Sequence, residues 1–193
     1  MRVSPWIGLS LLLVSSVGVA EDELRPLQQA TLLLKILSFD RNLESRTKGG
    51  LKVAVVYREN DPESEAVHSE MSRALEDAAR SMAGIQGPIQ VVHLPYTTEG
   101  RFESDLVKMR PGAVYVAHSL SSQINFIART TRRLRVLTFT ADENDVRRGL
   151  SVGLIVRDSR PRILVNLVAS KSEGADLSSE MLRLAEVIAG SPG

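Results

Sequence analysis

Short apolar segments rich in β-branched residues alternate along the chain with segments whose apolar residues recur every three or four positions. The first pattern is typical of strands buried on both faces of a sheet, and the second is typical of helices with one buried face. Their alternation predicts right-handed crossovers and a largely parallel sheet. The predicted strands are 51–57, 89–93, 113–117 and 134–139, and the predicted helices are 27–39, 62–82, 102–109, 121–130 and 142–148.

The pattern changes after residue 150. Two strand-like segments, 151–157 and 162–167, are joined by a connection too short for a parallel crossover, so they should form an antiparallel hairpin at the edge of the sheet. A closing C-terminal helix is predicted from Asp176 onward, with Leu184 on its buried face, where a charged substitution should unfold the protein. The sequence therefore predicts a single three-layer α/β domain over residues 21–193, with a mostly parallel sheet.

The first twenty residues have the features of a cleaved signal peptide. Arg2 supplies a positive charge, residues 6–14 form a short apolar segment, and Gly18 and Ala20 are small residues at the positions that cleavage requires. The apolar segment is too short to span a bilayer, which needs about 20 residues. An uncleaved membrane anchor and a buried first helix are the alternatives. A cleaved signal would place the protein in the periplasm, with no membrane insertion afterwards.

Composition narrows the chemistry. The chain has 24 basic and 23 acidic residues, a balance that argues against a nucleic-acid-binding face. It has no cysteine, which excludes disulfides, thiolate nucleophiles and iron–sulfur clusters. Neither of the glycine-rich phosphate-binding motifs is present, so the sequence predicts no cofactor. Because no catalytic constellation is found either, it predicts that the protein is not an enzyme, with a hydrolase as the alternative.

The carboxyl ends of the predicted strands are where an open α/β sheet binds ligands. The polar residues there form a candidate ligand crevice and are Tyr57, His93, His118 and Ser119. A metal site would need a third ligand, such as Asp61 or Asp142, and no ligand spacing supports one. His68 lies on the polar side of its helix and is expected to be solvated.

Two further features have simple structural explanations. Ser119 lacks the flanking glycines of a nucleophile elbow, so Ser119 or Ser121 is interpreted as a helix cap. Arg129, Arg132 and Arg133 lie near the end of a predicted helix, where cations complement the helix dipole. The alternative is that these arginines contact an acidic protein partner.

Several segments taken together resemble the YfiR-like family of small periplasmic proteins. The resemblance includes a glycine-containing strand, a following strand with a hydrophobic–Asn–hydrophobic step at Asn166, and a last helix that opens with Ser178 and Ser179. These three polar residues also fit structural roles, as backbone partners at the ends of elements. The similar segments are 30–39, 53–57, 149–156, 162–167 and 177–185.

The resemblance implies a protein that acts by contact. Members of the family hold down a membrane-bound diguanylate cyclase by binding its periplasmic part. By resemblance, the partner would be the periplasmic domain of an inner-membrane signalling protein, either such a cyclase or a sensor kinase. The formation of a homodimer is a further possibility. A small single-lobe solute-binding module is the alternative. The chain departs from the family at residues 39–41, where many relatives have Trp-Pro, and in lacking cysteines.

Overall fold

The fold is known from a computed structural model, which describes residues 24–48 and 50–188. The predicted signal peptide lies outside the described residues. The strands form one seven-stranded sheet in the order β2-β1-β3-β4-β5-β6-β7. The strands are β1 (Leu51–Arg58), β2 (Ile89–Tyr96), β3 (Ala113–Val116), β4 (Leu137–Thr140), β5 (Val152–Arg157), β6 (Arg160–Asn166) and β7 (Glu186–Ile188).

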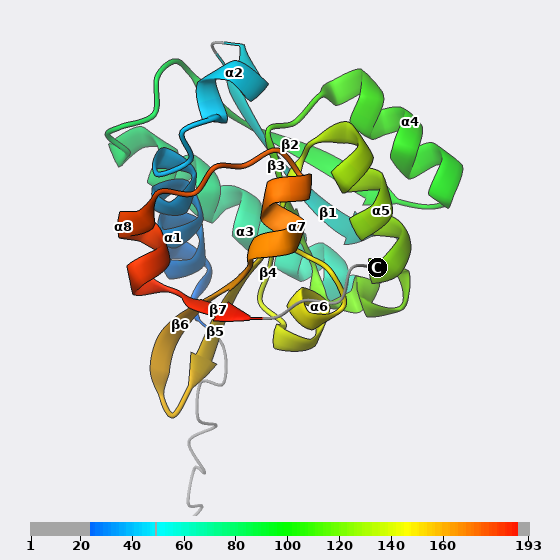
Figure 1. Cartoon of the computed structure of the whole chain (residues 1–193). Helices are drawn as coiled ribbons and strands as arrows, with labels where there is room; N and C mark the ends of the chain where they lie inside the picture. Colours follow the sequence, from blue (N-terminus) through cyan, green and yellow to red (C-terminus); the bar gives the residue numbers. More distant parts are fainter. Residues whose placement is uncertain (1–23, 49, 189–193) are drawn as a thin grey trace, which may run out of the picture.

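Helices cover both faces of this sheet (Figure 1). The first face carries α1, α3 and the C-terminal segment, and the second carries α4 and α5. Among the described residues, no helix has the length and apolar character needed to span a membrane. The helices are α1 (Pro26–Ser38), α2 (Leu43–Thr47), α3 (Pro62–Ser81), α4 (Glu99–Met109), the 3₁₀ helix η1 (His118–Gln123), α5 (Ile124–Leu134), α6 (Glu143–Arg147), α7 (Leu167–Ser172) and α8 (Ser179–Leu184).

The central strands are buried on both sides, as their continuous apolar character predicted. In β1, Val53 and Val55 pack under α1 and α3, whereas Ala54 and Val56 pack under α4 and α5. This arrangement follows from the twofold alternation of side chains along a strand. The predicted three-layer α/β domain is therefore confirmed.

Residues near the start of α3 also allowed its first residue to be predicted correctly from the sequence. The Asp61 side chain accepts a hydrogen bond from the backbone N–H of Ser64, and Pro62 occupies the first helical position. An N-cap aspartate satisfies a donor that the helix cannot pair internally, and proline has no N–H to lose there. The helix consequently begins where the sequence predicted.

The order of the strands creates a switch point between β1 and β3. From β1 the chain crosses to β2 on one side, and from β3 it crosses to β4 on the other. The loops that leave the two strands therefore diverge, and this is the position at which open α/β sheets bind ligands. The candidate residues at the ends of β1 and β3 lie at this position.

The C-terminal part of the chain departs from the prediction in its details. The antiparallel pairing of β5 and β6 is confirmed, but the hairpin is not the edge of the sheet, because β7 pairs in parallel with β6. The closing helix is much shorter than predicted. It ends at Leu184, and Ala185 takes an extended conformation that leads into β7. The β-branched pair Val187 and Ile188 favours a strand beside the open edge of β6.

Two short helices were not predicted at all. The segment 41–50, in which no helix was predicted, contains α2. The stretch after β6 contains α7, which begins directly at the end of the strand. Both helices are only one to two turns long, so neither has room for the repeated apolar spacing that reveals a longer helix.

The short α8 changes the expected effect of one substitution. The Leu184 side chain is 70% exposed, whereas Met181 is 1% exposed and packs in the core. The expectation that a charge at Leu184 unfolds the protein is therefore wrong.

We now expect Leu184→Asp to change the free energy of unfolding by less than about 0.5 kcal/mol. Met181→Asp should cost at least about 3 kcal/mol, because it removes apolar packing and buries a charge. Urea unfolding of both variants tests the pair, and equal effects would contradict the position of α8.

Candidate functional site

The candidate ligand crevice between β1 and β3 contains a connected set of hydrogen bonds. The guanidinium of Arg58, the last residue of β1, donates to the Ser119 carbonyl at 3.1 Å and to Gln123 Oε1 at 2.8 Å. The Ser119 hydroxyl donates to Ser64 Oγ at 2.6 Å, and Ser64 Oγ also accepts from the Arg58 backbone N–H at 2.8 Å. These contacts join β1, the first turn of α3 and η1 into one polar surface.

The two serines considered as helix caps do not act as caps. The hydroxyl of Ser119 is engaged with Ser64, and the hydroxyl of Ser121 donates to the His118 carbonyl. The helix η1 begins directly after β3 with no side-chain cap. The reason is that the strand passes into a 3₁₀ turn, whose tighter winding pairs groups three residues apart.

His118 faces away from Ser119 and toward the end of β4. Its Nδ1 lies 3.1 Å from Asp142 Oδ2, and a second carboxylate, Asp145, is 1% exposed beneath them. Burial raises the pKa of Asp145 to about 6, and the nearby Asp142 carboxylate adds to the shift. The Ser119 hydroxyl bonds to Ser64 Oγ, and among the described residues no hydrogen bond joins it to the His118 ring that would act as its base.

Tyr57 and His93 are brought together by His68, which was expected to be solvated. The His68 ring stacks on Tyr57 with a centroid distance of 3.9 Å, and its Nε2 lies 2.7 Å from His93 Nδ1. His68 is half-buried, and His93 is exposed. The prediction for His68 is wrong because the crossover packs this part of α3 over the neighbouring strands β1 and β2.

A basic groove lies at the opposite end of the sheet, where α2, α4 and α5 end. Its charged rim carries Lys48, Arg110 and Arg135, which are all exposed. Each of these residues ends its helix in the left-handed conformation, with φ of 47°, 50° and 56°, respectively. The groove has a volume of about 430 Å³. Its apolar lining is Leu106, Val107, Pro111, Leu134 and Val136.

The arginines named from the sequence lie on α5, next to this groove. Arg133 forms an ion pair with Glu103 at 2.9 Å, and Arg132 donates to the Gly149 carbonyl at 3.0 Å. Arg129 is exposed, and it makes no ion pair or hydrogen bond with any other residue that the structure describes. Arg133 and Arg132 therefore bind residues of this chain, whereas Arg129 faces solvent.

The residues of the resembling motifs hold the C-terminal elements in place. Asn166 is fully buried, and its Oδ1 caps α7 by accepting from the Ala169 N–H at 3.0 Å. Ser178 caps α8 through a hydrogen bond from the Met181 N–H, and Ser179 opens that helix. Each contact stabilises the start of a helix, where backbone donors lack partners.

The backbone conformation and a close side-chain contact explain why a glycine precedes β5. Gly149 has a φ of +119°, and a Cβ at this position would lie 2.6 Å from Arg132 Nη2. Any other residue would be strained in its backbone and would push the guanidinium aside. The hydrogen bond between Arg132 and the Gly149 carbonyl therefore depends on a glycine there.

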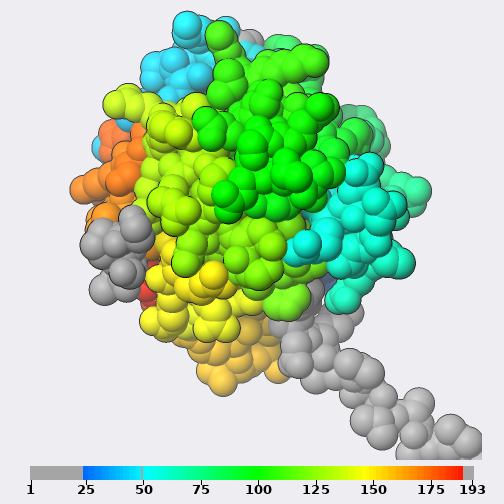
Figure 2. Space-filling view, turned by 90° about the vertical axis from the view of Figure 1, so that its right-hand side faces the viewer, coloured from blue at the N-terminus to red at the C-terminus, as the bar shows by residue number. Residues whose placement is uncertain are grey.

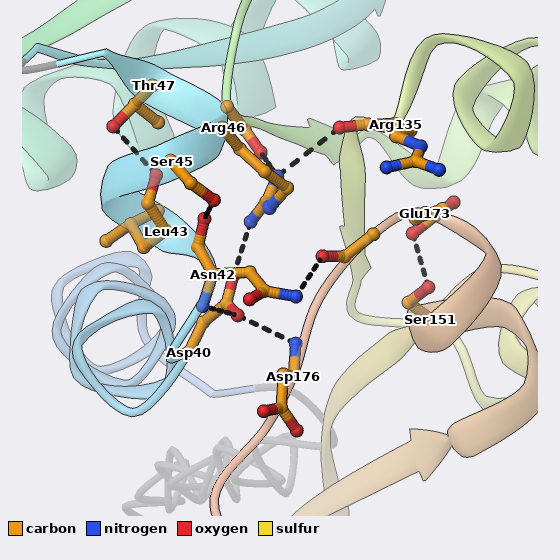
Figure 3. A network of polar contacts seen from close by, with 12 residues as sticks. Asp40, Asn42, Leu43, Ser45, Arg46, Thr47, Arg135, Ser151, Glu173 and Asp176 are labelled. Atoms are coloured by element: carbon orange, nitrogen blue, oxygen red, sulfur yellow. Dashed lines mark hydrogen bonds and ion pairs between the residues drawn. The ribbon is translucent and has the colours of Figure 1, made fainter.

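A buried ion pair fastens the first helices to the rest of the domain (Figure 3). Arg46 Nη2 lies 2.5 Å from Asp40 Oδ2, and the two side chains are 8% and 0% exposed. The other guanidinium nitrogen, Nη1, donates to the carbonyls of Gly112 and Arg135. Asp40 Oδ1 accepts from the Asp176 N–H at 2.8 Å, which ties the C-terminal segment to the same point.

A second buried carboxylate, Glu173, lies close by at the end of α7 (Figure 3). It accepts hydrogen bonds from the Thr131 hydroxyl, the Thr138 hydroxyl and N–H, and the Ser151 hydroxyl. Burial raises the pKa of Glu173 to about 7, and the hydrogen bonds to its oxygens oppose this shift. Its donors come from α5, β4 and the start of β5, so its role is to join elements.

Comparison with known proteins identifies the family. A family model described as DUF4154, YfiR/HmsC-like, matches residues 28–186. The chain therefore belongs to the YfiR/HmsC-like family, as its motifs predicted. A search of curated proteins finds no match to the chain.

Solved structures show the same fold in other proteins. A ligand-free, open substrate-binding protein with adhesive properties from Clostridium difficile is 13% identical with a TM-score of 0.56, covering 78% of this chain and 58% of that one. An ABC domain in complex with L-Trp from Streptococcus pneumonia is 14% identical with a TM-score of 0.61, covering 85% and 62%. A conserved domain protein from Vibrio cholerae is 16% identical with a TM-score of 0.61, covering 86% and 60%. The chain thus spans about 60% of these structures.

Sequence reasoning missed several residues that shape these sites. Arg58 is the last residue of β1, so its place at a strand end was a usable signal. Lys48 and Arg110 directly follow the last residues of two helices that lie far apart in the sequence, and only the fold brings them beside Arg135. Glu173 gave no local signal, because its partners lie 22 to 42 residues away.

The shifted pKa of Glu173 generates a stability prediction. Between the ordinary pKa of 4.5 and about 7, the native state holds a proton that the unfolded chain has released. The contribution of Glu173 to stability is therefore fully present at low pH and falls by up to about 3 kcal/mol as the pH rises through this window. We expect the difference in the free energy of unfolding between the wild type and Glu173→Gln to move by this amount between pH 5 and pH 8.

The matched control is Glu180→Gln, which changes an exposed glutamate on α8. Its effect on the free energy of unfolding should be the same at both pH values. Urea titrations of the three proteins provide the comparison. A wild-type curve that stays parallel to that of Glu173→Gln across the range would show that Glu173 is ionised throughout.

Proposed function

We propose that this protein is a periplasmic regulator that binds the periplasmic domain of an inner-membrane signalling enzyme and holds down its activity. The enzyme is a diguanylate cyclase or a sensor kinase. The observation that carries the proposal is membership of the YfiR/HmsC-like family over residues 28–186, because the family resemblance implies this role. The predicted signal peptide, residues 1–20, would deliver the protein to the periplasm.

The polar crevice supports action by contact rather than by turnover. A serine nucleophile needs a base within hydrogen-bond reach. In the described structure the hydroxyl of Ser119 bonds to another hydroxyl, and the neighbouring His118 is turned toward Asp142. The residues at the strand ends therefore favour a binding surface.

The basic groove is the surface that we assign to the partner. In Figure 2 the cyan atoms at the end of α2 meet the green and yellow-green atoms of α4 and α5 along the upper rim of the molecule. Three cations surround an apolar lining there, and none of the three side chains is paired with an acidic side chain among the described residues. This combination fits an acidic, amphipathic segment of the partner, whose charges meet the rim and whose apolar side chains enter the groove.

The backbone of the rim supports the same assignment. A non-glycine residue in the left-handed conformation costs roughly 1 kcal/mol, and glycine or asparagine is the usual residue at such a helix end. Lys48, Arg110 and Arg135 all occupy this costly conformation. Attraction to the helix dipole repays part of the cost. A partner that binds the three charges accounts for their convergence on one groove.

A small solute-binding module is the second candidate function. The fold similarity to a substrate-binding protein and the polar crevice between β1 and β3 favour it. Both functions hold together if a solute in the crevice controls release of the partner. A solute that binds only the native state would raise the melting temperature, so a thermal shift with a panel of small solutes tests this candidate.

Deletion in the native host tests the principal proposal. Loss of an inhibitor should raise cyclic-di-GMP or change the output of the partner kinase. Crosslinking in intact cells, followed by recovery of the attached membrane protein, should identify the partner. Unaltered signalling together with no membrane protein crosslinked would contradict the proposal.

Charge reversal in the groove tests the assigned surface. We expect the triple variant Lys48→Glu, Arg110→Glu and Arg135→Glu to lose crosslinking to the partner and to weaken its binding about tenfold or more, because like charges would then face one another. The matched control is Arg129→Glu, which reverses an exposed arginine of α5 outside the groove. If Arg129→Glu abolished binding and the triple variant did not, the partner would bind the α5 arginines named from the sequence.

A further inference from the structure

Two of the three histidines in the chain face one another across α3 and β2. His68 Nε2 and His93 Nδ1 are 2.7 Å apart, and the ring centroids are 4.8 Å apart in an edge-on arrangement. At this separation one nitrogen carries a proton and the other presents its lone pair. The pair is therefore a proton-bridged couple, and its two inward nitrogens point at a common position.

We propose that His68 and His93 form a two-histidine site for a divalent transition metal ion, Cu²⁺ or Zn²⁺. Neutral imidazole nitrogen is the side-chain ligand that suits both ions. In the metal-bound form the ion takes the place of the bridging proton, and the ring that carried this proton holds it on its outer nitrogen instead. Both imidazole rings are therefore neutral before and after the ion replaces the bridging proton.

The movement required is small. Two nitrogens bound to one tetrahedral Zn²⁺ at about 2.0–2.1 Å lie about 3.3 Å apart. The present separation is 2.7 Å, so the rings need to move apart by about 0.6 Å. Rotation of the exposed His93 side chain provides this movement without any shift of the backbone.

The surroundings hold one ring and leave the other accessible. Tyr57 stacks on His68 and fixes its plane, while Ser72 Oγ lies 3.5 Å from His93 Nδ1. Burial lowers the pKa of His68, the facing His93 lowers it further, and Glu65 opposes the shift. The ring stacking and the contact with His93 together hold the His68 ring with its Nε2 directed at His93.

The rest of the coordination sphere is open. In the part of the chain that the structure describes, no three histidine or carboxylate side chains are grouped closely enough to hold a metal. Water would therefore complete the sphere, and Glu65, one helical turn before His68, is the nearest carboxylate on α3. An open site of this kind releases its ion readily and is suited to sensing an ion rather than to storing it. The bound ion would join α3 to β2 beside the crevice.

The test is a metal titration of the untagged, chelator-treated protein, expressed from its complete coding sequence. We expect one equivalent of Zn²⁺ or Cu²⁺ to bind in isothermal titration calorimetry and Mg²⁺ not to bind. His68→Gln and His93→Gln should each weaken binding at least about tenfold. His118→Gln is the matched control, because it removes the remaining histidine, and it should bind as the wild type does.

A second measurement keeps the proposal testable if a variant fails to fold. Long-range ¹H–¹⁵N spectra of the wild-type imidazoles should show Zn²⁺-dependent shifts of His68 Nε2 and His93 Nδ1, with no change at His118. Binding that follows His118, or no binding of either ion to the folded wild type, would overturn the assignment. Neither result would affect the proposed partner surface, which lies at the other end of the sheet.

Discussion

The buried ion pair between Asp40 and Arg46 is the interaction on which the arrangement of this domain depends. The cost of removing two charges from water is offset only when further hydrogen bonds accompany the pair, and removal of one partner commonly costs about 3–5 kcal/mol. Here Arg46 also donates to the carbonyls of Gly112 and Arg135, and Asp40 also accepts from the backbone of Asp176. One pair therefore positions the starts of β3 and β4, the end of α5 and the C-terminal segment.

The basic groove is a consequence of this pair. Arg46 lines the groove, and the carbonyls that it holds belong to segments next to Arg110 and to Arg135 itself. Glu173 acts on the same region from the other side, since it binds Thr131 on α5 and Thr138 on β4. The end of α5 is thus held by two buried carboxyl groups, Glu173 directly and Asp40 through Arg46. The exposed cations of the rim are carried on a rigid base, which reduces the entropy lost when a partner binds.

The sequence predicted those elements whose start, end or burial is determined by residues close together in the chain. The start of α3 is set by Asp61 and Pro62 within a few residues, and the burial of β1 on both faces is visible in its own residues. The last helix was overestimated because Leu184 and Ile188 fit a helical spacing, whereas pairing with β6 made residues 186–188 a strand. The candidate sites were less predictable, since His68 meets His93 only after a crossover, and the groove joins three helix ends.

The two surfaces lie at opposite ends of the same sheet. The groove lies where β3 and β4 begin, and the histidine pair lies toward the carboxyl ends of β1 and β2. An ion or solute at one end changes affinity for a partner at the other only if one element has two arrangements that both ends bias. The central strands are packed on both faces and make poor candidates. The helix α3 packs beside α1 and carries both Ser64 and His68, so it joins the histidine pair to the hydrogen-bonded network at the ends of β1 and β3, whereas none of its residues lines the groove.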